Sequence, residues 1–494
     1  MALSSLLGVQ AKENKREKPN VIVILADDLG FGDVSLYGSK TLKTPCIDAL
    51  ANSGLRFNQG FCTSATSTPS RYALLTGMYP WRKQVSILPG DAPLIITETQ
   101  PTLPKLFRQA GYSTGVVGKW HLGLGNGTIN WNETIKPSPF EIGFDYSYIM
   151  GATNDRVPCV YVENGKVDNL DPNDPISVSY QKNFDGEPTG ANNPELLKMY
   201  PSHGHNMSIV NGISRIGFMK GGKKALWKDE TMASVFLDKV KSFIAENKET
   251  PFFLYYALNE PHVPRAPHSD FVGKSGMGPR GDAVLEADWC IGQLTAYLQS
   301  MGLADNTIII FSSDNGPVLD DGYKDQAQEL ADQHNHKPAG PYRGGKYSLF
   351  EGGTHVPFII SWPKEVPAGE TSDAMVCQMD LLSSFASFLG EELPEGLDSE
   401  NHINAFLGKS KKGRTSLVTE ASGRLAFKEG DFLMIPPHNG AATDTDTKSE
   451  LGNNKGYQLY NTKKDPAELH NLAAVKDKLM EKMKKSFKQQ SAEK

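Results

Sequence analysis

Cysteine is scarce in this sequence, and long apolar runs are missing altogether. There are five cysteines, an odd number without the spacing of a metal site: Cys46, Cys62, Cys159, Cys290 and Cys377. This pattern excludes a disulfide framework and a cysteine-type zinc site, although one or two bridges remain open. No stretch of eighteen apolar residues occurs, so we expect no transmembrane helix.

An excess of basic residues is also absent. The formal net charge is -6, which argues against a general affinity for nucleic acid or other polyanions through bulk charge. Recognition of an anion must therefore be local. With 494 residues, 39% hydrophobic and 22% charged, the chain is long enough for a large core and a second, smaller domain.

The N-terminal segment has part of the character of an export signal. Residues 2–11 resemble the end of a secretory hydrophobic region with its cleavage site, but no basic residues precede them. We interpret residues 1–18 as the remnant of an export signal followed by a charged lead-in. A frayed terminus is the alternative.

The segment from Ser67 to Gly77 is typical of a short helix. Pro69 suits its first turn, where the missing N–H costs nothing, and Gly77 suits its end. Ser67 then lies at the N-terminus of this helix, where unpaired backbone N–H groups and the helix dipole favour an anion. Arg71 can bring its guanidinium to the same place. We therefore expect a small nucleophile beside an oxyanion.

Two continuous apolar runs, residues 21–25 and 307–313, predict strands buried on both faces of a sheet. Each run leads into oxygen-bearing side chains, which are Asp27 and Asp28 after the first and Asp314 and Asn315 after the second. Ligands bind beyond the carboxyl ends of strands in open α/β sheets. Such oxygens suit Ca²⁺ or Mg²⁺ and would be poor ligands for zinc or copper. Helix capping is the alternative, but it would have to occur twice.

Two further predicted strands end in basic side chains. Residues 113–117 lead into Lys119 and His121, and residues 251–258 lead into His262. A Lys and a His two residues apart can point the same way into the crevice. A structural histidine is the alternative at each position. By contrast, we expect the charges of the helix that follows, Glu286 and Asp288 among them, to lie on a solvated face.

Residues 125–226 are rich in Asn, Pro and Gly and contain few periodic apolar segments. This is long for a plain loop, so we interpret it as an insertion that shapes a substrate pocket. Its polar clusters include Asp155-Arg156 and the pair His203 and His205. A surface ion pair or an exposed histidine pair explains them as well as a binding role does.

The segment Ser67-Thr68-Pro69-Ser70-Arg71 resembles the (Cys or Ser)-x-Pro-x-Arg signature of the sulfatases whose catalytic residue is a formylglycine. Residues 344–357, which contain Lys346, are similar to the second long signature of this family, except that His355 stands where members often carry Arg. Residues 456–461 and 465–472 resemble the family's C-terminal strand and turn. The resemblance thus spans most of the chain from residue 19 onward.

This resemblance implies a sulfuric ester hydrolase with the α/β fold of the alkaline phosphatase superfamily. That fold has a large mixed sheet between helices, followed by a smaller α+β domain with a short antiparallel sheet. We expect the catalytic domain at residues 19–365 and the C-terminal subdomain, which ends in a Lys-rich helix, at residues 366–494.

The resemblance also implies how the site is completed. Ser67 would be oxidised to formylglycine (3-oxoalanine) by a radical maturase of the anaerobic bacterial type. One Ca²⁺ would be bound by a set of oxygen ligands: Asp27, Asp28, Asp314, Asn315 and the modified Ser67. The protein would be bacterial and exported, either periplasmic or secreted.

The other matching residues receive roles in catalysis. Arg71 and Lys119 would steady the formylglycine oxygens, and His121 is the candidate base. Lys346 and His262 would neutralise charge on the sulfuryl oxygens, and His262 would donate a proton to the leaving alcohol.

The expected substrate is a sulfated carbohydrate. Asp155 and Arg156 resemble the pair with which galactose- and N-acetylgalactosamine-6-sulfatases hold the axial O4 of the sugar, and His205 is a further candidate ligand. We expect exo-acting 6-O-desulfation of galactose or N-acetylgalactosamine in host or dietary glycans.

Two alternatives remain. The first is a phosphate or phosphonate monoester hydrolase of the same superfamily, which typically needs further ligands for a second metal. The second is a non-catalytic sulfoglycan-binding protein in which Ser67 stays a serine.

Overall fold

The structure is a computed structural model that describes residues 18–492. Apart from its last residue, the predicted export-signal remnant at 1–18 lies outside the described residues. Within the described range, no helix combines the length and the apolar character needed to span a bilayer.

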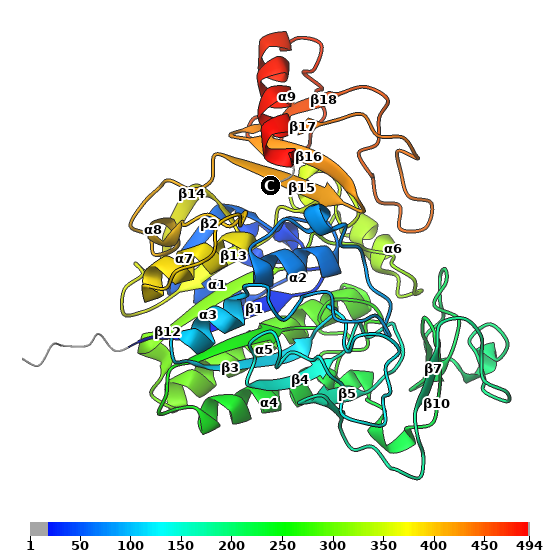
Figure 1. Cartoon of the computed structure of the whole chain (residues 1–494). Coiled ribbons are helices and arrows are strands. Elements are labelled where there is room, and N and C mark those ends of the chain that lie inside the picture. Colours follow the sequence, from blue (N-terminus) through cyan, green and yellow to red (C-terminus); the bar gives the residue numbers. More distant parts are fainter. Residues whose placement is uncertain (1–17, 493–494) are drawn as a thin grey trace, which may run out of the picture.

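A ten-stranded mixed sheet forms the centre of the molecule (Figure 1). From one edge to the other its strands are β14 (Glu370–Cys377), β2 (Leu55–Phe61), β13 (Phe358–Ser361), β12 (Thr307–Ser313), β1 (Asn20–Ala26), β11 (Phe252–Ala257), β3 (Ser113–Lys119), β4 (Tyr146–Met150), β5 (Tyr161–Glu163) and β6 (Lys166–Val167). The strands β12, β1, β11, β3 and β4 run parallel to one another. Their carboxyl ends therefore lie along one edge of the sheet.

Side chains of β1 alternate between two hydrophobic cores, as the pleat of a strand requires. Val21, Val23 and Leu25 pack with helices α2 (Ser67–Thr76), α3 (Leu103–Gln109), α7 (Leu381–Leu389) and α8 (Ile403–Phe406). Ile22 and Ile24 pack with α1 (Pro45–Asn52), α4 (Met232–Glu246) and α5 (Gly278–Ser300). Figure 1 shows α2, α3 and α7 on one side of the sheet and α4 and α5 on the other. This burial on both faces confirms the interpretation of the apolar run at residues 21–25.

The helices are short except for three. Their bounds are α1 (Pro45–Asn52), α2 (Ser67–Thr76), α3 (Leu103–Gln109), α4 (Met232–Glu246), α5 (Gly278–Ser300), α6 (Ala327–Gln333), α7 (Leu381–Leu389), α8 (Ile403–Phe406) and α9 (Asp477–Ser491). The prediction that the charges of α5 lie on a solvated face is wrong for Glu286 and Asp288, which are both buried. Asp288 accepts hydrogen bonds from backbone N–H groups at the start of α1, and these bonds compensate its burial.

A small antiparallel sheet follows, as expected. It contains β15 (Ser416–Ala421), β16 (Arg424–Glu429), β17 (Phe432–Ile435) and β18 (Gln458–Asn461), and α9 packs on it through Met480 and Met483. The strand β14, which follows the expected domain boundary at residue 366, pairs with β2 and belongs to the large sheet.

The region 125–226 is built in two parts. Its first part supplies β4, β5 and β6, which extend the large sheet. Its second part carries two small ribbons, β7 (Ser177–Ser179) with β10 (Phe218–Lys220) and β8 (Ile209–Val210) with β9 (Ile213–Ser214). In Figure 1 the β7–β10 ribbon projects from the side of the large sheet.

Candidate active site

The two oxygen-bearing pairs predicted at strand ends lie side by side. The strands β1 and β12 are paired in parallel, so that the residues after them meet. The backbone N–H of Asp28 donates to Asp314 Oδ1 at 3.2 Å, and Asn315 Nδ2 donates to Asp28 Oδ1 at 2.7 Å. The side chains of Asp27, Asp28, Asp314 and Asn315 are all buried.

Two oxygen atoms of this cluster lack a hydrogen bond, although the Arg71 guanidinium lies 3.7 Å from one of them, Asp27 Oδ1. Among the described residues, Asp27 Oδ1 and Asn315 Oδ1 are buried and accept no hydrogen bond. Burial raises the pKa of Asp27 well above its ordinary value, even though Lys119 opposes this effect. Unpaired hard oxygens beside three carboxylates are what a Ca²⁺ or Mg²⁺ site offers, so these residues fit such an ion.

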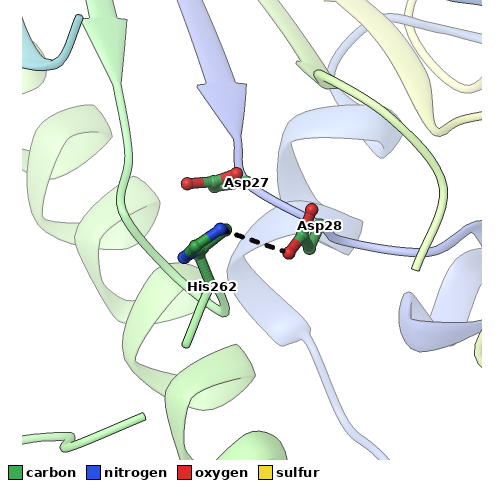
Figure 2. Close-up of side chains that lie close together, drawn as sticks. All are labelled: Asp27, Asp28 and His262. Carbon is green, nitrogen blue, oxygen red and sulfur yellow. Dashed lines mark ion pairs between the residues drawn. The ribbon is translucent and has the colours of Figure 1, made fainter. Parts of the chain in front are cut away.

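A histidine lies close to the same carboxylates. Asp27, Asp28 and His262 offer ligand atoms within 4.8 Å of one another. Figure 2 shows the His262 ring turned toward Asp28, with Nε2 at 3.8 Å from Asp28 Oδ2. His262 Nδ1 lies 2.6 Å from the Val263 carbonyl oxygen and therefore carries the proton. Burial, with help from Lys119 and Lys346, lowers the pKa of His262 well below its ordinary value.

Ser67 is the first residue of α2, as the motif predicted, and Gly77 ends the helix at a φ of 65°. Arg71 Nε donates to Ser67 Oγ at 2.9 Å. The same guanidinium binds Asp314 Oδ2 through Nε at 3.2 Å and through a terminal nitrogen at 2.8 Å. Arg71 thus ties the serine to the carboxylate cluster.

His121 lies on the other side of the serine, with Nδ1 at 3.2 Å from Ser67 Oγ. Its Nε2 is 2.9 Å from the carbonyl oxygen of Leu88, so the proton sits on Nε2. Burial lowers the pKa of His121 well below its ordinary value, and Lys119 adds to the effect. The ring is therefore neutral, with the lone pair of Nδ1 facing the serine hydroxyl.

The two predicted lysines are bound to carboxylates of the cluster. Lys119 Nζ donates to Asp27 Oδ2 at 2.6 Å, and Lys346 Nζ donates to Asp28 Oδ2 at 2.9 Å. The expected contact between Lys119 and Ser67 is not among the hydrogen bonds of the described residues. Lys119 instead neutralises a carboxylate next to the serine.

Residues from the insertion complete the site. Thr153 accepts from Arg156 at 2.7 Å, and Asp155 accepts from the same guanidinium at 3.1 Å. His205 Nε2 lies 3.0 Å from Asp155 Oδ2. Burial lowers the pKa of His205, but the Asp155 carboxylate outweighs it and the pKa is raised overall.

A small pocket joins these groups. It is lined by Ser67, Ile87, His121, Asp155, Arg156, His205, Ile216, His262, Asp321, Lys346 and Tyr347. The sequence prediction assigned no role to Asp321 or Tyr347. Asp321 closely follows the Asp314-Asn315 pair, and Tyr347 lies within the signature at 344–357. His355, where the family signature departs, is buried against Glu351 and the Asn58 carbonyl and does not line this pocket.

Comparison with known proteins identifies the family of this chain. The family model described as Sulfatase matches residues 19–391. A second model, described as the C-terminal part of N-sulphoglucosamine sulphohydrolase, matches residues 345–494. Together the two matches span the chain from residue 19 to its end.

Individual relatives are similar over most of their length. The chain is 51% identical to an N-acetylgalactosamine-6-O-sulfatase of Bacteroides thetaiotaomicron, over 92% of this chain and 90% of that protein. It is 31% identical to an N-acetylgalactosamine-6-sulfatase of Sus scrofa, over 77% and 65%. A structure from a study of glycosaminoglycan metabolism by B. thetaiotaomicron has a TM-score of 0.93 at 50% identity, covering 96% of this chain and 99% of that one. The chain therefore belongs to the sulfatase family, a family of sulfuric ester hydrolases with this mixed-sheet fold.

Proposed function

We propose that this protein removes the 6-O-sulfate from a terminal galactose or N-acetylgalactosamine of a sulfated glycan. The observation that carries the proposal is one pocket in which Ser67 lies together with Asp155, Arg156 and His205. The names of the two relatives, both N-acetylgalactosamine 6-sulfatases, support the choice of sugar and of sulfate position.

The proposal includes a calcium ion and a formylglycine at residue 67. Asp27, Asp28, Asp314 and Asn315 would hold the ion together with the modified residue, and their unpaired oxygens support this assignment. When bound, the ion supplies positive charge that orients and polarises a sulfate oxygen.

The surrounding side chains have separate tasks around residue 67. Arg71 holds the oxygen of residue 67 from one side. His121 accepts a proton on Nδ1 from the other side, because its Nε2 proton is committed to the Leu88 carbonyl. Such a base within hydrogen-bond distance meets the geometric requirement for general base catalysis.

Lys346 and His262 lie at the part of the pocket next to Asp28. The Lys346 ammonium neutralises charge on the sulfuryl oxygens. To donate to the leaving alcohol, His262 must first take up a proton on Nε2, since its Nδ1 proton is held by the Val263 carbonyl.

Asp155, Arg156 and His205 recognise the sugar. Asp155 accepts hydrogen bonds from Thr153 and lies against Arg156 and His205, which fixes the carboxylate in the pocket wall. A hydroxyl that bonds to such buried groups is discriminated strongly, because its absence leaves them unpaired. The axial O4 of the galactose series is the hydroxyl that we assign to them.

The test measures sulfate release by the mature protein from four sugars: 6-sulfated N-acetylgalactosamine, 6-sulfated galactose, 6-sulfated N-acetylglucosamine and 4-sulfated N-acetylgalactosamine. We expect sulfate release from the first two at a kcat/KM at least about 100-fold above the others. Asp155→Asn should lose most of this preference. Asp171→Asn, at an exposed ion pair with Lys224, is the matched control and should behave like the wild type.

Equal activity on the glucosamine epimer would reject the sugar assignment. Faster cleavage of a phosphate or phosphonate monoester by the same preparation would favour the phosphohydrolase alternative. Glycan binding without sulfate release would favour the binding-protein alternative.

The modification is tested separately by mass spectrometry of the peptide that spans Phe61 to Arg71, on protein from its native host. A mass lower by two hydrogen atoms at Ser67, or the hydrate of that species, would establish the aldehyde. Unmodified serine from a host that contains the radical maturase would contradict this part of the proposal. Fractionation of that host tests the proposed export to the periplasm or medium.

A further inference from the structure

Lys346 is held by two carboxylates, and only one of them belongs to the predicted cation site. Its ammonium donates to Asp28 Oδ2 at 2.9 Å and to Asp321 Oδ2 at 2.8 Å. The Lys346 side chain is 4% exposed and that of Asp321 is 11% exposed. A pair this well buried is screened little by solvent, so the position of the ammonium follows the position of its partners.

The other lysine of the site differs in this respect. Lys119 donates to Asp27 alone among the described carboxylates within salt-bridge distance. When a divalent ion occupies the cluster, the charges of Asp27 and Asp28 are directed to that ion. Lys119 is then left without a carboxylate of its own, whereas Lys346 keeps Asp321.

Asp321 is itself fixed by its surroundings. Its second oxygen, Oδ1, accepts from the Tyr347 hydroxyl at 3.1 Å. Tyr347 follows Lys346 at a φ of 72°, a conformation that costs a non-glycine residue free energy. Three hydrogen bonds hold this strained turn: Lys346 N–H to Pro317 O at 2.9 Å, Tyr347 N–H to Ala65 O at 2.9 Å and Arg424 to Tyr347 O at 2.8 Å.

We propose that Asp321 is a positioning residue that keeps the Lys346 ammonium at the sulfate subsite when the cation engages Asp28. The proposal rests on the proposed sulfatase site, and it assigns to Asp321 no contact with the sugar. The hydrogen bond from the Tyr347 hydroxyl fixes the orientation of the Asp321 carboxylate.

The experiment uses the calcium-loaded protein and compares Asp321→Asn, Asp321→Glu and Asp320→Asn. Asparagine keeps the size of the side chain but removes the charge that holds Lys346, and glutamate restores the charge. Asp320 is the matched control, because it is the neighbouring aspartate and binds Ser202 Oγ at 2.6 Å instead of a pocket residue.

The first readout is the affinity for inorganic sulfate, measured by calorimetry. Removal of a negative charge from an anion site should by itself tighten sulfate binding. We expect the opposite in Asp321→Asn, a weakening of about fivefold or more, because the displaced ammonium no longer meets the anion. Asp320→Asn should bind sulfate like the wild type. This measurement needs no turnover, so it can be interpreted even if the sugar proposed above is wrong.

The second readout is the kinetics on 6-sulfated N-acetylgalactosamine. We expect kcat to fall about 10- to 100-fold in Asp321→Asn with KM changed less than about threefold, and partial recovery of kcat in Asp321→Glu. Tighter or unchanged sulfate binding in Asp321→Asn would overturn the proposal. A rise in KM at constant kcat would also overturn it, because it would make Asp321 a ligand of the sugar.

Discussion

At the scale of single residues, an acidic pair is buried outside the active-site pocket. Glu260 precedes the cis peptide bond to Pro261, and Glu286 lies on α5. Burial raises the pKa of both carboxyls, and the charge of Glu260 raises that of Glu286 further. These groups are therefore protonated more readily in the folded chain than in the unfolded one.

This pair makes stability depend on pH in a defined direction. The unfolded carboxyl ionises near its ordinary value of 4.5, whereas the folded one ionises only at higher pH. The free energy of unfolding therefore falls as pH rises above that value. Glu286→Gln cannot ionise and still can accept the hydrogen bond from the His268 N–H.

We expect Glu286→Gln to be more stable than the wild type by about 2 kcal/mol or more at about pH 8, and nearly unchanged at about pH 5. Urea unfolding at the two pH values measures this difference. Glu249→Gln, at an exposed position, should show no such gain. A variant that is less stable than the wild type at the higher pH would contradict the argument.

At the scale of elements, the end of β3 is the tightest place near the site. Gly118 pairs with Ala257 of β11 and has a φ of 111°. A Cβ at Gly118 would lie 1.8 Å from the Ala257 carbonyl oxygen. The strand can therefore deliver Lys119 and His121 to the cluster only if residue 118 is a glycine.

Gly118→Ala is expected to destabilise the protein by about 3 kcal/mol or more and to reduce sulfate release strongly. Gly111→Ala is the matched control, since Gly111 has a φ of 84° but no atom within 4 Å of the added Cβ. The control variant should lose only the free energy that the backbone strain costs, about 1 kcal/mol. Thermal unfolding of both variants separates steric overlap from backbone strain, and equal losses would refute the steric account.

The strands that carry the site could be predicted from the sequence, because each is buried on both faces and reads as an uninterrupted apolar run. The residues at their ends follow directly from that register, as Asp27 and Asp314 illustrate. The pairing of β14 with β2 could not be predicted, since β2 lies far away in the sequence and leaves no local signal. The burial of Glu286 was missed for a related reason, because helical spacing alone does not reveal a neighbour packed against a charged position.

The pocket wall was harder to predict than the strand ends. Asp321 lies in the loop after β12, and only the folded chain brings it to Lys346. Similarly, His205 contacts Asp155, which lies fifty positions earlier in the sequence. Family resemblance pointed to Asp155, but the contacts of both pairs could be found only from the side-chain geometry.

At the scale of the whole molecule, the cation should stabilise the folded state by linking the ends of two paired strands. Four of its expected ligands directly follow β1 and β12, which are paired through Asn20 to Ala26. An ion that binds only the folded state adds about 2.7 kcal/mol of stability at a concentration 100 times its Kd.

Calcium is therefore expected to raise the Tm, and a chelator should reverse the rise. Asp314→Asn should abolish this response, whereas the surface variant Asp171→Asn should retain it. Differential scanning calorimetry with and without calcium measures the shift. Identical Tm values under both conditions in the wild type would argue against a bound divalent ion.

The burial of α2 limits the time during which Ser67 is accessible while the chain is synthesised. All ten residues of this helix are buried. The segment before it is covered by the small sheet, because Ala65 N–H donates to Glu420 O at 2.8 Å and Glu420 N–H donates to Thr63 O at 2.9 Å. Ser64 and Glu420 are 356 positions apart.

A ribosome that adds about 5–20 residues per second needs roughly 20–70 seconds to cover that distance. Throughout this interval Ser67 has been synthesised, but β15, which pairs with the segment just before it, does not yet exist. An enzyme that modifies Ser67 must therefore act within this interval or on a chain that is kept unfolded. The rate of translation, as much as the affinity of the maturase, would then set the fraction of molecules that become active.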